Sequence, residues 1–99
     1  MNKNMDWYLY MIRCEDKSLY TGITTDVDRR LSEHRANGDD GAKYLRGRGS
    51  LTLVFQKKLG SRSLALVVEN KVKKLPKAKK EQMIEDITII DEIINQVRT

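Results

Sequence analysis

A short helix with an arginine and a histidine on its apolar side is the feature that most limits how this chain can fold. With Asp26 as the N-cap, Val27, Arg30 and His34 fall at helical spacing on one side of the segment that follows. Arginine is rarely buried unless it is paired. Arg30 should therefore meet either a carboxylate of the protein or an anion from outside, and our hypothesis is that this anion is a phosphate group.

Two tyrosine-bearing strands are predicted directly before this helix. Residues 7–14 are aromatic and β-branched with apolar side chains on both faces, which is typical of a central strand covered on both sides. Residues 15–18 form a polar turn and residues 19–24 resume the strand pattern, so the two strands should form a hairpin. Gly22 interrupts the second strand, which indicates a bulge or a place where another backbone or a ligand comes close.

The next part of the chain predicts further elements around this hairpin. After a helix over about 27–36, a loop leads to a third strand over 51–55. A second helix is predicted from Arg62 to about Leu75, with Ser61 as its N-cap. The sequence therefore predicts alternating sheet and helix segments without an internal repeat or linker.

The C-terminal part is predicted to be one amphipathic helix that begins at Pro76, because proline is tolerated in a first helical turn. Its apolar seam comprises Met83, Ile87, Ile90, Ile94 and Val97. Ile89 and Ile93 widen this seam, which suggests ordinary core packing or a contact in a homodimer. The β-branched run over 87–90 makes a terminal strand the alternative.

Composition limits the class of protein. The chain has 99 residues, enough for one domain that buries about 60–70% of the surface its unfolded form exposes. Cys14 is the only cysteine, which excludes an internal disulfide, and no Cys/His spacing resembles a zinc site. The N-terminal residues lack the apolar core of a secretion signal, and no apolar run approaches the roughly 18 residues of a membrane helix. The sequence thus predicts a soluble cytoplasmic protein.

Basic residues gather in the middle of the chain. Residues 57–80 hold nine lysines and arginines and a single carboxylate, Glu69, whereas residues 81–99 are acidic overall. This distribution indicates either a nucleic-acid-binding surface or a solvated lysine-rich helix face. Glu69 is then either a surface ion-pair partner or the ligand of a metal ion. The residues assigned to nucleic-acid binding are Lys43, Arg46, Arg48, Lys71, Lys74 and Lys77.

Residues 7–10 read Trp-Tyr-Leu-Tyr and residues 20–22 read Tyr-Thr-Gly. Arg30 and His34 follow in a helix, and Glu69 follows in a later helix. The order of these features resembles the GIY-YIG nuclease superfamily. No single piece is specific, because tyrosines in strands are usually core residues, but the set in this order is specific.

The resemblance implies an α+β fold with a small three-stranded, mainly antiparallel sheet flanked by helices in the order ββαβαα, in agreement with the elements above. Residues 6–84 would form the GIY-YIG-like domain, as in small stand-alone bacterial members, and residues 85–99 a C-terminal helix extension that packs on the domain or on a partner. The sequence departs from the family pattern at two positions. Tyr8 stands where the first motif has glycine, and Thr21 replaces the isoleucine of the second.

The resemblance also implies chemical roles. The positions matched to catalytic or accessory roles are Tyr10, Tyr20, Arg30, His34 and Tyr44. The two motif tyrosines would orient or deprotonate water, and a base role needs a pKa lowered from its usual value near 10. Arg30 would meet the scissile phosphate, and Glu69 would bind a divalent metal, Mg²⁺ or Mn²⁺. His34 is alternatively a helix residue whose ring nitrogens are satisfied locally.

The expected function is a metal-dependent endonuclease that hydrolyses DNA phosphodiester bonds, selective for DNA structure and acting in repair or recombination. The alternative is a catalytically weak or inactive module on the same fold that binds nucleic acid through its lysines. DNA is the expected partner and RNA the alternative. A partner protein or a weak homodimer, formed through the isoleucine-rich C-terminal helix, is the third hypothesis.

Overall fold

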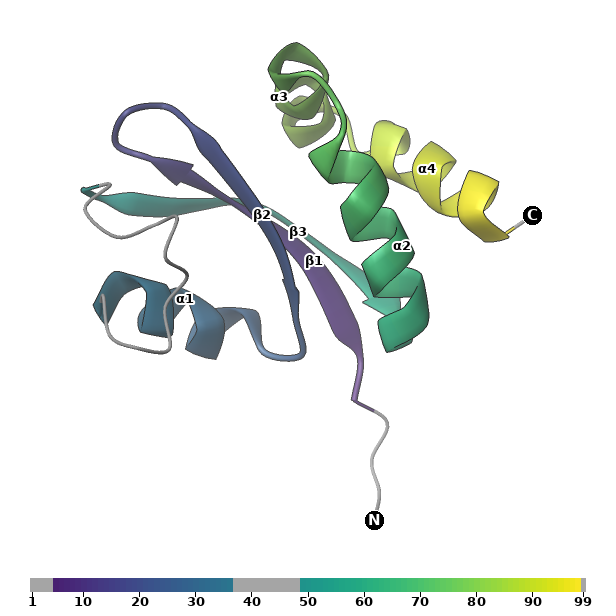
Figure 1. Ribbon diagram of the computed structural model, residues 1–99, viewed down its shortest axis with the longest axis horizontal. Helices are drawn as coiled ribbons and strands as arrows, with labels where there is room; N and C mark the ends of the chain where they lie inside the picture. Colours follow the sequence, from purple (N-terminus) through teal and green to yellow (C-terminus); the bar gives the residue numbers. More distant parts are fainter. Residues whose placement is uncertain (1–4, 37–48, 99) are drawn as a thin grey trace.

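The computed structural model describes residues 5–36 and 49–98 and shows an α+β fold (Figure 1). Within these residues, three strands and four helices follow one another in the order ββαβααα. They are β1 (Trp7–Cys14), β2 (Leu19–Thr24), α1 (Val27–Ala36), β3 (Leu51–Gly60), α2 (Arg62–Lys73), α3 (Lys77–Glu85) and α4 (Thr88–Arg98). The expected fold class is confirmed, and the predicted hairpin and the helix that follows it are both present.

The strands form one antiparallel sheet in the order β2-β1-β3. The central strand is β1, as its two apolar faces predicted, and β2 is an edge strand. Tyr10 lies opposite Gly22 of β2 and opposite Gln56 of β3. The two motif tyrosines, Tyr10 and Tyr20, therefore lie on neighbouring strands of the hairpin.

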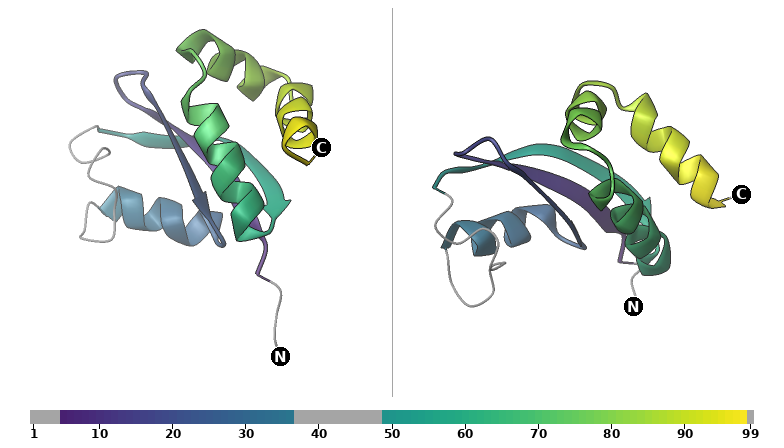
Figure 2. Two further views of the ribbon diagram at one scale, coloured as in Figure 1. Left: turned by 45° about the vertical axis from the view of Figure 1, so that its right-hand side comes forward. Right: turned by 45° about the horizontal axis from the view of Figure 1, so that its top comes forward.

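Helices cover both faces of this sheet, as Figure 2 shows. One face packs on α1, where Tyr10, Ile12 and Val27 share a small core. The opposite face packs beneath the C-terminal helices. The core there includes Leu9, Met11, Phe55, Val68, Val72, Met83, Ile90 and Ile94. Because alternate residues of β1 enter different cores, each face is stabilised separately, at about 1.5–3 kcal/mol for each large apolar side chain buried.

The observed β3 is longer than the sequence predicted. The apolar alternation ends at Phe55, yet the strand continues through Lys57 and Lys58 while it pairs with β1. The Lys57 ammonium lies 3.1 Å from the Asp91 carboxylate, and that of Lys58 lies 3.4 Å from Asp6. Pairing with a central strand therefore outweighs the low strand propensity of lysine.

The helix that follows Pro76 is two helices rather than the predicted one. Asp86 leaves the helical conformation, with φ −135° and ψ 101°. Its carboxylate accepts hydrogen bonds from the backbone N–H of Thr88 at 3.0 Å and from the Thr88 hydroxyl at 2.7 Å, which caps α4. The capping aspartate therefore ends α3 and starts α4 in a new direction.

This break corrects two details of the predicted C-terminal segment. Ile87 was placed in the buried seam, but it lies in the break and exposes 48% of its surface. The alternative of a terminal strand over 87–90 is also wrong, because the chain is helical from Thr88. Ile90 and Ile94 are buried as predicted and pack with the α2 core.

An ion pair ties the end of β1 to α3. The guanidinium of Arg13 donates hydrogen bonds of 2.7 Å to both carboxylate oxygens of Glu81. Such bidentate pairs restrict orientation as well as distance. The pair therefore fixes α3 beside the hairpin, which also fixes the position of the preceding residue, Lys80.

Over residues 5–36 and 49–98, no helix is long and apolar enough to cross a membrane.

Candidate active site

Three rings from β1, β2 and α1 meet on the α1 side of the sheet. The Tyr10 hydroxyl and Nε2 of His34 share a hydrogen bond of 2.8 Å. The Tyr20 ring packs edge-on against the His34 ring, with centroids 5.5 Å apart, and lies 6.3 Å from the Tyr10 ring. Sequence reasoning placed these residues in one site, and the structure brings all three into contact.

The local sequence explains why these rings meet. Asp26 caps α1 as predicted, since its carboxylate accepts a hydrogen bond of 3.1 Å from the backbone N–H of Arg29. The capped helix turns His34 toward the sheet, where the side chain is almost fully buried. Gly22 faces Tyr10 across the hairpin and leaves room for the tyrosine ring. The cap and the glycine therefore position the two hydrogen-bonded partners.

Burial controls the protonation of this cluster. Burial, followed by the nearby Tyr20, raises the pKa of the Tyr10 hydroxyl well above its ordinary value, although Arg30 acts in the opposite direction. Burial also lowers the pKa of His34, and the positive charge of Arg30 lowers it further. Tyr10 is therefore a neutral phenol and His34 a neutral imidazole at pH 7. Tyr10 therefore lacks the lowered pKa that a tyrosine needs in order to act as a base.

Arg30 lies at the border of the cluster. Its side chain is 28% exposed, and Nη1 lies 2.8 Å from a carboxylate oxygen of Glu33, one helical turn further on. Burial lowers the pKa of Arg30, but hydrogen bonding to Glu33 and Tyr10 raises it by more, so the guanidinium stays charged. Of the two expectations for Arg30, the carboxylate partner is thus observed, and enough of the side chain is exposed for an anion to reach it.

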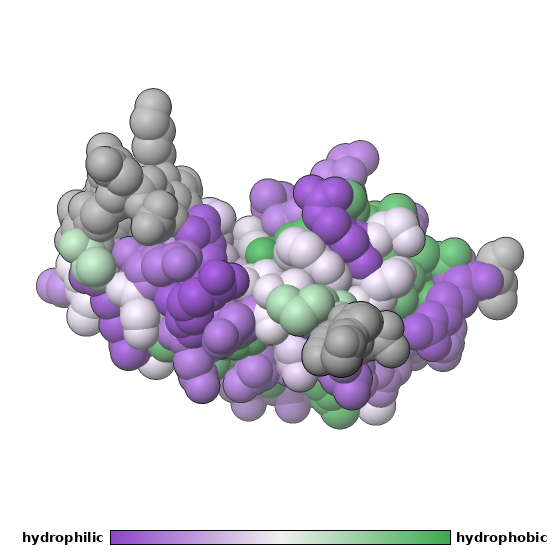
Figure 3. Space-filling view, turned by 90° about the horizontal axis from the view of Figure 1, so that it is seen from below, coloured by the Kyte–Doolittle hydropathy of each residue, from purple (hydrophilic) through white to green (hydrophobic). Residues whose placement is uncertain are grey.

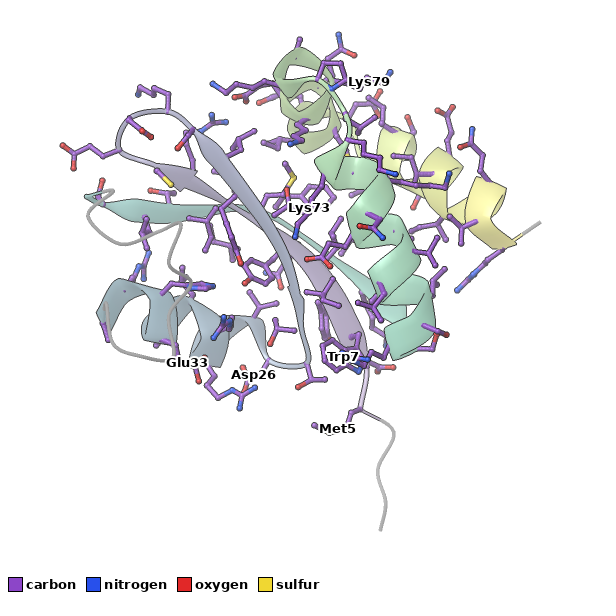
Figure 4. The ribbon with its side chains drawn as sticks, viewed as in Figure 1. Met5, Trp7, Asp26, Glu33, Lys73 and Lys79 are labelled. Carbon is purple, nitrogen blue, oxygen red and sulfur yellow. The ribbon has the colours of Figure 1, made fainter. Side chains whose placement is uncertain are left out.

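Glu69 lies on α2, which covers the other side of the sheet. Its side chain is only 16% exposed, and its carboxylate lies 3.2 Å from the ammonium group of Lys73. In Figure 4, Lys73 extends from α2 toward β2. Among the described residues, no group of three or more histidine, cysteine, aspartate or glutamate side chains could hold a metal together. A metal here would have Glu69 as its protein ligand, an arrangement that suits Mg²⁺, which keeps several waters.

A shallow pocket connects Tyr20 with the α2 side. It has a volume of about 260 Å³ and is lined by Leu19, Tyr20, Thr21, Lys73 and Lys80. Tyr20 is half-buried, contacts His34 and also lines this pocket. It therefore joins the ring cluster on the α1 side to the cations on the α2 side, across the edge strand of the sheet.

The predicted lysines of α2 and α3 lie apart from the ring cluster and the pocket lining. Lys71, Lys74 and Lys77 are exposed on or beside α2 and α3, and Lys77 lies 3.7 Å from Glu81. The other predicted positions, Lys43, Tyr44, Arg46 and Arg48, lie outside the described residues.

Sequence reasoning missed two pocket lysines and the position of Thr21. Lys73 follows Glu69 by four residues, a spacing that predicts a helical ion pair. Thr21 was noted only as a departure from a motif. Lys80 carried no signal of its own, because its place depends on how α3 folds back toward the hairpin.

The surface around this region is polar. Figure 3 shows hydrophilic residues covering much of the half of the molecule that carries α1. The hairpin with its two tyrosines lies between α1 and α2, and these two helices supply the arginine and the glutamate of the candidate site.

This arrangement of a tyrosine-bearing hairpin between an arginine helix and a glutamate helix is that of a nuclease-type catalytic domain. The GIY-YIG catalytic domain matches residues 6–82, and the chain belongs to this family. It is 48% identical over 93 residues to the UPF0213 protein YhbQ of Escherichia coli O127:H6, covering 94% of this chain and 91% of that protein. It is 46% identical, with the same coverage, to the YhbQ protein of Salmonella arizonae.

Two solved structures are similar to this fold. The solution structure of the UPF0213 protein BH0048 from Bacillus halodurans is 46% identical and has a TM-score of 0.53, covering 82% of this chain and 84% of that one. The solution structure of EF2693 from E. faecalis is 35% identical and has a TM-score of 0.61, covering 90% and 93%. These bacterial proteins share both the sequence pattern and the architecture of the chain.

Proposed function

We propose that this protein is a metal-dependent endonuclease that hydrolyses DNA phosphodiester bonds. The observation that carries the proposal is the position of Tyr20, whose ring touches the Tyr10–His34 cluster and lines the lysine-bearing pocket. A nuclease needs an oriented nucleophile beside cations that meet the developing negative charge. The family membership supports this class of reaction.

In this proposal, each side chain has a role that depends on how exposed it is. Tyr20 is the accessible phenol and orients the attacking water. Tyr10, neutral and hydrogen-bonded to His34, positions Tyr20 rather than acting as the base. Arg30 turns from Glu33 to the phosphate and stabilises its charge as a fixed fork. Losing such a donor costs about 3–4 kcal/mol of transition-state stabilisation.

Glu69 is the residue that would hold the divalent metal. Its carboxylate is mostly shielded from water and already attracts a cation, the ammonium of Lys73, so its environment suits a positive charge. A bound divalent metal supplies Lewis-acid stabilisation of the phosphate and the leaving oxygen. Because GIY-YIG nucleases generally use a divalent metal, Mg²⁺ or Mn²⁺ is the expected cofactor.

A domain of this size offers little surface for reading a long sequence. We therefore propose selectivity for the shape of DNA, such as a nick, flap or junction, which would suit a role in cytoplasmic repair or recombination.

The test is cleavage of end-labelled duplex, single-stranded, flap and four-way-junction DNA with Mg²⁺ or Mn²⁺. Wild type is compared with Glu69→Gln, which keeps the size of the side chain and removes its charge. Metal-dependent cutting that the variant loses supports the proposal. Equal cutting by both proteins would show that Glu69 is not the ligand or that the activity belongs to a contaminant.

One observation favours a second candidate, a module that binds nucleic acid without cutting it. Lys73 already neutralises Glu69, as a structural ion pair would. On this reading, DNA binds with a steep salt dependence, and Glu69→Gln leaves the affinity unchanged. Binding without cleavage on every substrate in the panel would establish this candidate in place of the nuclease.

A further inference from the structure

Thr21 carries a polar group that the fold does not satisfy. The side chain is on the edge strand β2 and is only 4% exposed. Its hydroxyl Oγ1 is buried and is the one side-chain polar atom in the described residues that is buried without a hydrogen-bond partner. Buried hydroxyls are nearly always bonded, because leaving one unpaired is costly. A ligand that enters beside Thr21 can supply the missing partner.

The surroundings of Thr21 define the chemistry of that ligand. Thr21 lines the pocket of about 260 Å³ together with Leu19, Tyr20, Lys73 and Lys80. The described lining thus offers two ammonium groups, a phenol and an unpaired hydroxyl; the lining residues include no carboxylate, although the Lys73 ammonium also lies 3.2 Å from the Glu69 carboxylate. Ammonium groups can only donate hydrogen bonds, and a hydroxyl can donate as well. Such a lining selects an anion with several acceptor oxygens.

The pocket is built from three separate elements. Tyr20 and Thr21 come from β2, Lys73 from the last turn of α2, and Lys80 from α3. The neighbouring Glu81 is held by both guanidinium nitrogens of Arg13, which fixes α3 next to the hairpin. The lysines are therefore brought to Thr21 by tertiary structure and not only by the local charge of the sequence.

We infer that Thr21, Lys73 and Lys80 form a subsite for a backbone phosphate of the bound nucleic acid, next to the phosphate attacked beside Tyr20. The inference rests on the proposed function, because a chain of phosphates is what places a second anion beside the reacting one. The Thr21 hydroxyl donates a hydrogen bond to a phosphate oxygen, while the two lysines supply charge. Thr21 is a substrate-positioning residue in this subsite.

Removing the Thr21 hydroxyl and removing the Lys80 charge should affect DNA binding in different ways. Thr21→Val keeps the shape of the side chain and removes the donor, so it should weaken DNA binding by about tenfold or more without changing the salt slope. Thr21→Ser keeps the donor and should restore most of the affinity. Lys80→Ala should weaken binding and also reduce the salt slope by about one.

Lys79 is the matched control. It carries the same charge on the same helix but is not among the residues that line the pocket, and in Figure 4 it lies on α3 at the top of the view. Lys79→Ala should change affinity less than Lys80→Ala. Equal effects of the two lysine variants would show a diffuse basic surface and overturn the subsite.

The experiment uses fluorescence anisotropy of a labelled single-stranded DNA in EDTA, so that neither metal nor cleavage contributes. Melting temperatures are measured on the same metal-free variants. Thr21→Val should melt at or above the wild-type temperature, because it removes an unpaired hydroxyl. A melting temperature several degrees lower, or unchanged DNA binding, would overturn the inference.

Titration with inorganic phosphate, followed by amide NMR shifts at Thr21 and Lys80, separates this inference from the proposed function. If wild type cleaves DNA and Thr21→Val binds DNA as tightly as wild type, the proposed nuclease function stands and the phosphate subsite is overturned. Phosphate-induced shifts in a protein that binds no DNA would show an anion pocket and overturn both the nucleic-acid ligand and the nuclease.

Discussion

The ring of Tyr10 occupies the space that a side chain on Gly22 would need. A Cβ built on Gly22 would lie 2.6 Å from the Tyr10 hydroxyl oxygen and 2.8 Å from the ring carbon that bears it. The two residues lie opposite each other in the hairpin, so the strand pairing itself enforces this approach. The glycine of the second motif is therefore the surface on which the tyrosine of the first motif lies.

Gly22→Ala should accordingly destabilise the fold and move Tyr10 away from His34. Overpacking of this kind costs about 1–3 kcal/mol, and it should appear as a lower midpoint in urea unfolding. The double variant Gly22→Ala with Tyr10→Phe removes the atom closest to the new methyl group. We expect the double variant to lose less stability than the sum of the single variants; strict additivity would mean that the two residues do not contact each other.

His34 should titrate below its ordinary pKa of 6.5, because burial and the charge of Arg30 both disfavour the imidazolium. It is the only histidine, so one pair of ring NMR signals reports it without assignment. Since the folded-state pKa is below the unfolded one, stability should be complete above pH 6.5 and fall as the pH drops below it. In Arg30→Met the titration should move upward; no movement would show that Arg30 does not act on the ring.

Arg30→Lys should reduce the rate of DNA cleavage by about a hundredfold to a thousandfold, since lysine keeps the charge but loses the planar fork. Glu33→Gln is the matched control, because it removes the carboxylate that pairs with Arg30 in the free protein. Cleavage by Glu33→Gln should equal or exceed that of wild type in single-turnover assays. If Glu33→Gln reduced the cleavage rate as much as Arg30→Lys does, the intact ion pair, rather than Arg30 alone, would be required for cleavage.

Lys73→Met should strengthen the binding of Mn²⁺ to Glu69, because the ammonium group competes for the same carboxylate. Exposed ion pairs contribute up to about 1 kcal/mol, which corresponds to a gain of up to about fivefold. Titration monitored by electron paramagnetic resonance measures the affinity directly. Lys71→Met removes the same charge from the same helix without breaking the pair, and a gain of equal size there would reveal only a general change of net charge.

Arg13→Ala and Glu81→Ala should each lower the melting temperature, because each breaks the bidentate pair between β1 and α3. Part-exposed pairs contribute about 1 kcal/mol at most, so a shift of several degrees is the upper limit for a domain of this size. The pair also lowers the pKa of Glu81, so its stabilisation should be present above the ordinary carboxyl pKa and decline as acid protonates Glu81. If the double variant loses as much as the two single variants together, the pair does not couple β1 to α3.

Sequence reasoning reached the central strand, the hairpin and the capped helix, because short-range patterns encode each of them. It grouped Tyr10 with His34 through the family resemblance, since no short-range pattern links residues so far apart in the chain. It missed the division of the last helix at Asp86, since an aspartate in an amphipathic pattern looks like an ordinary polar position until its capping bond is seen. It also missed Lys80, whose place beside Thr21 depends on the return of α3 toward the hairpin. Tertiary contacts of this kind leave no periodic signal in one sequence.

Tyr20 and Thr21 are consecutive residues of an edge strand, and successive side chains of a strand leave it in opposite directions. A slip of β2 by one residue against β1, such as a deletion in the 15–18 turn could cause, would exchange the two faces: Thr21 would turn toward His34, and the Tyr20 ring would leave its contact with His34. The length of that turn thus determines which face of the sheet each of these two side chains occupies. Insertions or deletions there should lower the stability of the fold as well as abolish function, because they also move Gly22 away from Tyr10.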